Sequence, residues 1–213
     1  MKQWCAIFDL DGTLVDSEVL NCRAYVELIA EIDESDIELS YRYRGMKFAN
    51  IVYDIETRFE VELPVDFESL YRDRVVALYE SELKANPGVP ELLSGLEIER
   101  CVASSAPTKK INHALELTSL GGYFGTNIFS SYDIGSWKPE PDLFLHAAAT
   151  MNHSPAHCVV VEDSDFGVEA AIAAGMHVFH YAPNSAKTRR DRYQSIQQMS
   201  ELSGLFAEFA EAI

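Results

Sequence analysis

Two aspartates stand two positions apart near the start of the chain, in the segment Phe8-Asp9-Leu10-Asp11-Gly12-Thr13. The apolar residues before them predict a buried strand. If the strand geometry continues to Asp11, both carboxylates lie on the same face. Such a pair is electrostatically costly without a cation. A hard divalent ion such as Mg²⁺ would offset that cost by binding a carboxylate, a backbone carbonyl and phosphate oxygens.

A serine pair closes the next apolar run. Ser104 ends Cys101-Val102-Ala103, and Ser105 follows it ahead of a predicted helix. A hydroxyl and backbone N–H groups at such a junction could hold a phosphate oxygen. Serines before helices are more often N-caps, so this signal is weak when taken alone.

A lysine and a second acidic pair complete the set of polar candidates. Lys138 lies between Trp137 and Pro139, in a stretch whose two prolines stiffen the backbone. Its charge could neutralise a carboxylate nucleophile and a phosphoryl group, although many lysines before helices are merely solvated. Glu162 and Asp163 follow another apolar run, at the place where they could complete a metal site begun at Asp9.

The elements that must position these residues alternate along the chain. Short apolar runs are typical of buried parallel strands, while the stretches between them have helical spacing. The predicted strands are 4–9, 100–104, 127–130, 158–161 and 177–181, and the predicted helices are 88–95, 108–118, 141–151, 165–174 and a terminal helix at 198–210. This alternation predicts an α/β fold with a parallel sheet, whose ligands bind beyond the carboxyl ends of the strands.

One long section breaks the alternation. Between about 17 and 85 no strand is predicted, and apolar residues have helical spacing at 18–31, 48–59 and 67–83. We therefore expect an inserted helical cap domain at 17–86, within a core domain made of 1–16 and 87–213. The connections at 13–17 and 84–88 would be two linkers that permit hinged closure.

Composition limits the classes of partner. The 213 residues include 34 acidic and 17 basic side chains, giving a formal charge of -17, which disfavours nucleic acids and anionic membranes. A small phosphorylated substrate remains possible, because a metal ion and a few local cations reverse the potential inside one cleft. With no signal-like start and no long apolar stretch, we expect a cytoplasmic protein that is a monomer or weak homodimer. The four scattered cysteines are expected to be reduced thiols.

Taken in order, the motifs DxDGTxxDS, Ser, KPxPxxF, EDS and AAxxAG strongly resemble the haloacid dehalogenase superfamily. More narrowly, they resemble its β-phosphoglucomutase-like (CbbY-type) branch, which has a Rossmann-like core and a helical cap inserted after the first strand. The match covers about residues 1–182. The first motif is its most specific part.

The resemblance implies a role for each motif. Asp9 would be the nucleophile that forms an aspartyl-phosphate, and Asp11 the general acid and base. Mg²⁺ would be bound by Asp9, the backbone carbonyl of Asp11 and Asp163. Glu162 would touch the metal or orient its waters. The phosphate would be held by Ser104 and Lys138, helped by the N–H groups around Leu10 and Ser105.

The sequence differs from the motifs of related enzymes in the superfamily, and these differences reduce the number of possible activities. Dehalogenases of the superfamily usually lack the second aspartate, so Asp11 favours phosphoryl transfer. The phosphonate-cleaving members have a lysine early in the cap, where this chain has Val19 to Cys22. The mutases have a histidine where Asn21 stands, which favours hydrolysis over isomerisation.

The cap segment Tyr41 to Phe48 resembles the family's cap loop that faces the active site. Its glycine is followed by a lysine two positions on, as in the bacterial 6-phosphogluconate phosphatases that this chain resembles. We expect Arg44 and Lys47 to contact the distal end of the substrate, such as the carboxylate or hydroxyls of a sugar acid. The alternative is that both are surface cations.

The sequence thus predicts a magnesium-dependent phosphatase of a small phosphorylated metabolite, either a sugar phosphate or a sugar-acid phosphate. A phosphosugar mutase with the same covalent intermediate is the alternative. A non-catalytic binding module that retains the fold is the third possibility.

Overall fold

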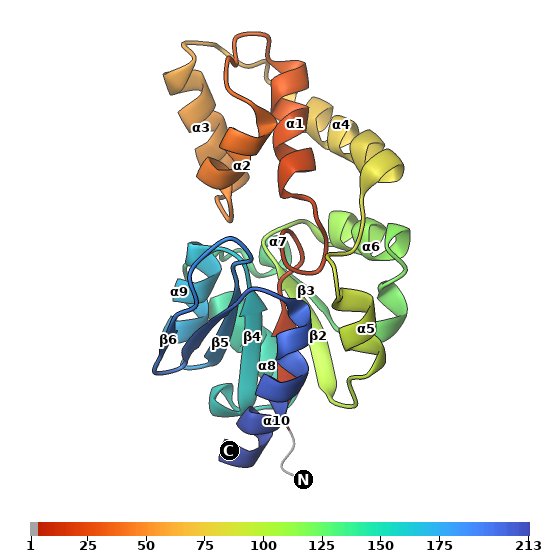
Figure 1. The fold of residues 1–213 in the computed structure, drawn as a ribbon. Coiled ribbons are helices and arrows are strands. Elements are labelled where there is room, and N and C mark those ends of the chain that lie inside the picture. Colours follow the sequence, from red (N-terminus) through yellow and green to blue (C-terminus); the bar gives the residue numbers. More distant parts are fainter. Residues whose placement is uncertain (1–3) are drawn as a thin grey trace.

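The computed structural model describes residues 4–213, which form a central sheet with helices on both faces and further helices beyond one edge (Figure 1). The sheet has the strand order β3-β2-β1-β4-β5-β7-β6. All neighbouring strands are parallel except β6 and β7. The strands are β1 (Cys5–Phe8), β2 (Glu99–Ser104), β3 (Ile128–Ser130), β4 (Cys158–Glu162), β5 (His177–Tyr181), β6 (Arg189–Arg190) and β7 (Tyr193–Ile196). The predicted Rossmann-like α/β fold is confirmed.

The helices that cover the sheet lie after residue 88 of the chain. They are α5 (Val89–Ser94), α6 (Thr108–Leu117), α7 (Ser131–Ile134), α8 (Asp142–Thr150), α9 (Asp165–Ala173) and α10 (Leu202–Ala212). Each predicted helix of this region is present, with ends that differ by a few residues. The short helix α7 and the edge strands β6 and β7 were not predicted, because they are short and lack continuous apolar runs.

The central strands are buried on both faces, which explains their continuous apolar sequences. In β1 the side chains alternate between two clusters of the core: Ala6 and Phe8 pack on one face, Cys5 and Ile7 on the other. Strand β1 pairs with β2 and β4, in register from Cys5 onward. The carboxyl ends of these three adjacent strands therefore meet at one edge of the sheet, and the polar residues that follow them are brought together.

Four helices lie beyond that edge, and we call them the helical cap: α1 (Glu18–Leu28), α2 (Asp36–Tyr43), α3 (Phe48–Arg58) and α4 (Phe67–Glu82) (Figure 1). They pack around aromatic rings, with Tyr25 stacked on Tyr71 at 4.3 Å between centroids. Helix α2 was not predicted, although Ser35 and Glu38 form a capping box at its start. The domain boundaries at 17 and 86 remain a proposal.

The two connections between the sheet and the helical cap are hydrogen-bonded to each other. The Asp16 N–H donates to Lys84 O (2.9 Å), and the Asn86 N–H donates to Leu14 O (3.0 Å). The Asn86 side-chain amide also donates to the carbonyls of Gly12 and Thr13, at 2.9 Å each. The outgoing and returning chain segments are thus tied together next to the loop that carries Asp11.

Two predictions made from composition, on membrane-spanning helices and on the cysteines, can be compared with the structure. Across 4–213, no helix combines the length and apolar character that a membrane crossing requires. The four cysteines are buried, and their thiols are free.

Candidate active site

Asp9 is the first residue after β1, and it forms a buried ion pair with Lys138. The Asp9 N–H donates to Val161 O of β4 at 2.9 Å, which extends the strand pairing to this residue. Lys138 Nζ lies 2.5 Å from Asp9 Oδ1 and 2.6 Å from Glu162 Oε1. The Lys138 side chain is 2% exposed, so its ammonium group is fixed between two carboxylates.

The charges in this cluster shift the pKa of each partner. Burial raises the pKa of Asp9 well above its ordinary value; the Lys138 ammonium opposes this shift and the Glu162 carboxylate adds to it. Burial acts to lower the pKa of Lys138, but its two carboxylate neighbours outweigh burial and raise it. Lys138 is therefore positively charged at neutral pH, and the cluster still carries an excess of carboxylates.

Asp163 supplies a further buried carboxylate at the end of β4. Its Oδ1 accepts a hydrogen bond from Thr13 Oγ1 at 3.2 Å. Its Oδ2 is buried and has no hydrogen-bond partner among the described residues, and Arg44 Nε lies 3.5 Å away. Burial, followed by the charge of Glu162, raises the pKa of Asp163 well above its ordinary value.

These features fit a hard cation. Asp163 Oδ2, which accepts no hydrogen bond from the described residues, and the buried Asp9 carboxylate are oxygen donors of the kind that Mg²⁺ prefers, and a cation between them would offset their repulsion. Among residues 4–213 no group of three or more His, Cys, Asp and Glu side chains has metal-ligand spacing. Two carboxylates and one backbone carbonyl are consistent with this, because Mg²⁺ usually keeps several waters.

Glu162 does not have a free oxygen for a metal. Its Oε1 accepts from Lys138, and its Oε2 accepts from both the N–H (2.6 Å) and the hydroxyl (2.9 Å) of Ser164. Gly167 of α9 packs so closely on this carboxylate that a Cβ there would overlap it. Glu162 thus holds Lys138 in place.

Gly12 makes room for the Asp163 carboxylate. Its φ is +77°, and a Cβ at this position would overlap the Asp163 side chain. We expect Gly12→Ala to lower the free energy of unfolding by about 1–3 kcal/mol, because the left-handed backbone is strained for alanine and the carboxylate must move. Urea unfolding measures the first effect, and calorimetric titration with Mg²⁺ should reveal weaker binding.

Gly122→Ala is the matched control, because Gly122 has no left-handed φ and a Cβ there would meet nothing within 4 Å. Gly122→Ala should leave the free energy of unfolding and the affinity for Mg²⁺ unchanged. Unfolding and Mg²⁺ binding at wild-type values in Gly12→Ala would contradict the crowding described above.

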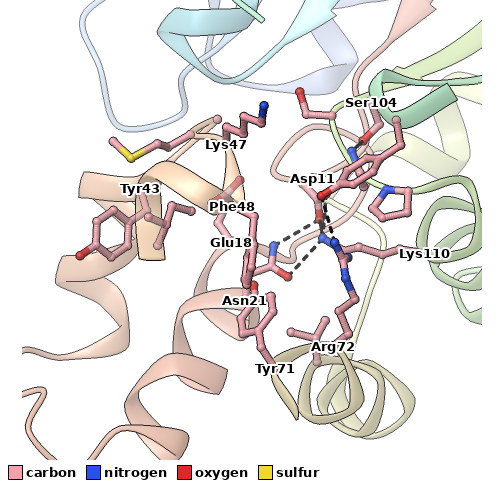
Figure 2. Close-up of a pocket in the computed structure, with 18 of the residues that line it drawn as sticks. Asp11, Glu18, Asn21, Tyr43, Lys47, Phe48, Tyr71, Arg72, Ser104 and Lys110 are labelled. Carbon is pink, nitrogen blue, oxygen red and sulfur yellow. Dashed lines mark hydrogen bonds and ion pairs between the residues drawn. The ribbon is translucent and has the colours of Figure 1, made fainter. Parts of the chain in front are cut away.

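The Asp11 side chain belongs to a separate network that includes Asn21 and Lys110 (Figure 2). Its Oδ1 accepts from Ser17 Oγ (2.6 Å), Tyr79 OH (3.0 Å) and Asn21 Nδ2 (3.3 Å), and Lys110 Nζ lies 3.0 Å from both of its oxygens. Burial acts to raise the pKa of Asp11, but Lys110 and the hydrogen bonds outweigh it and lower that pKa. Asp11 is therefore ionised in this arrangement.

Ser104 and Ser105 lie on the wall of a cavity of about 1000 Å³ that also contains Asp9, Asp11 and Lys138. Ser104 Oγ accepts from the Ala106 N–H at 3.1 Å, whereas the N-cap residue of α6 is Pro107, without a side-chain cap. The common N-cap explanation for this serine pair thus does not apply here.

The loop between α2 and α3 reaches the sheet side of the cavity. Lys47 lines the cavity, and its Nζ lies 3.7 Å from the centroid of the Trp137 ring. A Cβ on Gly45 would come within 2.5 Å of Ser164 Oγ, so this loop packs directly on the segment after β4. Arg44 is not one of the cavity-lining residues, and its Nε lies 3.5 Å from Asp163 Oδ2; its contact with the distal end of a substrate stays a prediction.

Several cavity residues were not predicted. Lys110, Tyr79 and Arg72 face the cavity from α6 and α4 (Figure 2). Burial and the Asp11 charge raise the pKa of Glu18, another cavity residue, to about 7. None of them belongs to a short motif. A basic residue near the start of a helix that follows a strand end is the signal that could have indicated Lys110.

The sequence and this arrangement can be compared with known proteins. A model of the haloacid dehalogenase-like hydrolases matches residues 5–175. The chain belongs to the haloacid dehalogenase-like hydrolase family. The family resemblance predicted from the motifs is therefore confirmed, and with it the prediction of an enzyme.

Two curated relatives of this haloacid dehalogenase-like hydrolase have named activities. It is 37% identical to the 6-phosphogluconate phosphatase of Escherichia coli over 204 residues, which cover 93% of this chain and 92% of that protein. It is 28% identical to the β-phosphoglucomutase of Bacillus subtilis over 182 residues, covering 80% of this chain and 79% of the mutase.

A solved structure confirms the fold of the family. A haloacid dehalogenase-like protein of unknown function from Agrobacterium tumefaciens superimposes with a TM-score of 0.82 at 32% identity. The match covers 98% of this chain and 100% of that one. This haloacid dehalogenase-like hydrolase therefore has the same architecture as the Agrobacterium tumefaciens protein over nearly its whole length.

Proposed function

We propose that this chain is a Mg²⁺-dependent phosphatase that hydrolyses a small phosphorylated sugar or sugar acid through an aspartyl-phosphate on Asp9. The observation that carries the proposal is the position of Asp9 at the end of β1, 2.5 Å from Lys138, on a cavity that Asp163 also lines. The likeness to a sugar-acid phosphatase supports hydrolysis of this substrate class.

The first step transfers the phosphoryl group to the enzyme. An Asp9 oxygen attacks phosphorus, the bond from phosphorus to the substrate oxygen breaks, and that oxygen takes the electron pair together with a proton from Asp11. Lys138 and the Ser104 hydroxyl would neutralise charge on the phosphoryl oxygens. The Asp11 carboxyl must enter this step protonated, so it must first leave the charged arrangement described above.

The second step returns the enzyme to its starting state. Asp11, now a carboxylate, takes a proton from water, whose oxygen attacks phosphorus while the bond to Asp9 breaks and the electrons return to the Asp9 carboxylate. Mg²⁺ bound by Asp9, Asp163 and the backbone carbonyl of Asp11 would supply charge neutralisation for the phosphoryl oxygens. Inorganic phosphate is then released.

A screen of phosphorylated metabolites for phosphate release, with and without Mg²⁺, tests the proposal. We expect release from sugar phosphates or sugar-acid phosphates that disappears when EDTA removes the metal. A hexose 1-phosphate distinguishes the mutase alternative, because a mutase yields the 6-phosphate and a phosphatase yields free phosphate. Absence of turnover on every substrate, including an aryl phosphate, would support the non-catalytic alternative.

Lys47 is the proposed contact for the distal end of the substrate. Its ammonium is held against the Trp137 ring at the cavity wall, where a substrate carboxylate could reach it. We expect Lys47→Ala to lower kcat/KM for sugar-acid phosphates by about 10- to 100-fold, the value of a charge-assisted hydrogen bond, with a much smaller loss for neutral sugar phosphates. Steady-state assays on both substrate classes measure the difference.

Lys187→Ala is a suitable control, because the exposed Lys187 pairs with Glu201 and does not line the cavity. It should not change either kcat/KM. Equal losses on both substrate classes in Lys47→Ala would exclude a carboxylate contact and leave Lys47 as a general positive charge.

A further inference from the structure

Four segments of the chain converge on the Asp11 carboxylate. Ser17 lies in the outgoing connection, Asn21 in α1, Tyr79 near the end of α4, and Lys110 in the first turn of α6 (Figure 2). Asn21 is itself held, because its Oδ1 lies 2.8 Å from Tyr79 OH, whose single proton serves either this oxygen or Asp11 Oδ1, and 3.4 Å from Lys110 Nζ. This fixes the amide so that its Nδ2 faces Asp11.

The contacts on the two carboxylate oxygens are unequal. The three uncharged donors all bind Oδ1, whereas Oδ2 accepts from Lys110 Nζ at 3.0 Å. Oδ1 lies off the axis of the last side-chain bond, so its three neighbours already resist rotation of the carboxylate. Lys110 Nζ lies 3.0 Å from both oxygens and adds a charged contact that reaches Oδ2. Lys110 therefore contributes the contact on Oδ2 to the orientation of the group.

Lys110 comes from a different part of the fold than the other partners of Asp11. The other three partners come from the helical cap or its connection, whereas Lys110 comes from a helix packed on the sheet. Its side chain is 22% exposed and reaches into the cavity. Lys110 thus connects Asp11 to a helix packed on the sheet, which carries Asp9.

We propose that Lys110 is a positioning residue that orients the Asp11 carboxylate to take the proton from water when the aspartyl-phosphate is hydrolysed. The proposal rests on the proposed function. In this step the water O–H bond breaks, the proton binds Asp11, the water oxygen bonds to phosphorus and the phosphorus bond to Asp9 breaks. Lys110 gives up no proton.

The two half-reactions can be measured separately with p-nitrophenyl phosphate. Its leaving group needs no proton, so formation of the phospho-enzyme depends little on Asp11, whereas hydrolysis of the phospho-enzyme depends on it fully. In Lys110→Met we expect nitrophenol formation in the first turnover to stay within about threefold of wild type and phospho-enzyme breakdown to slow by about 10- to 100-fold, part of the general-base contribution. Rapid quench with p-nitrophenyl phosphate that carries the radiolabel in its phosphoryl group measures both rates.

Two further variants sharpen the test. Lys110→Arg should recover part of the breakdown rate, because a guanidinium can also contact both carboxylate oxygens. Lys187→Met removes the same charge from a lysine that does not line the cavity, and it should behave as wild type. Equal slowing of both steps in Lys110→Met, or no slowing of breakdown, would overturn the positioning role.

Failure of this inference and failure of the proposed function give different results. A wild-type enzyme that never acquires label on Asp9 during turnover would refute the covalent pathway itself. Label that forms on wild type and decays at the same rate in Lys110→Met would refute the role of Lys110 alone.

Discussion

Replacing Asp9 by asparagine should abolish turnover, by about 10⁴-fold or more, the order of loss expected when a covalent nucleophile is removed. The amide has nearly the same shape as the carboxylate, but it cannot attack phosphorus. Its oxygen can still accept from Lys138, which also keeps its partner Glu162. Phosphate release under saturating Mg²⁺ measures the effect, and the unfolding curve should stay close to that of wild type.

The intermediate supplies an independent check on the same variant. Wild-type enzyme quenched during turnover should carry acid-stable, hydroxylamine-sensitive label on the peptide that contains residue 9, and Asp9→Asn should carry none. Appreciable turnover by Asp9→Asn, with label found on another residue, would contradict the assignment of the nucleophile.

Replacing Lys138 by methionine should reduce both activity and stability. Lys138 is the ammonium between the buried carboxylates of Asp9 and Glu162, with side-chain exposures of 8% and 2%. Its loss leaves two like charges without a counter-ion, and removing one partner of a buried pair costs about 3–5 kcal/mol. We also expect a loss in kcat of about 10²–10³, typical for removal of one group that stabilises transition-state charge.

A double variant separates these two effects. Adding Glu162→Gln to Lys138→Met removes one of the two unpaired charges, so part of the lost free energy of unfolding should return. Activity should not return, because no ammonium then lies beside Asp9. Guanidinium unfolding without metal and steady-state assays measure the two quantities. Recovery of activity in the double variant would show that Lys138 acts only by balancing Glu162.

The sheet and the motif residues could be predicted because both follow from local sequence. Continuous apolar runs identify strands buried on both faces, and parallel strands in adjacent positions bring their carboxyl ends together. Asp9 and Asp163 directly follow such strands and Ser104 ends one, so their convergence required only that the sheet form. Lys138 was found from the prolines around it.

The partners of Asp11 and the position of Arg44 could not be predicted in the same way. Lys110 and Tyr79 lie on helices, and helical spacing indicates which face is apolar but not which polar residue turns toward a distant loop. Their contact with Asp11 depends on how the cap sits on the sheet. Arg44 was predicted from the cap loop to contact the distal end of the substrate, and its ion pair with Asp163 depends on how that loop packs on the segment after β4.

The paired connections at Asp16–Lys84 and Leu14–Asn86 restrict how the four helices can move relative to the sheet. Two separate connections would allow twisting and sliding, whereas connections that are hydrogen-bonded to each other resist these motions. We therefore expect any opening of the cavity to follow a hinge rotation at the two connections. Since Asn86 also donates to the carbonyls of Gly12 and Thr13, such a rotation would pull on the loop that carries Asp11.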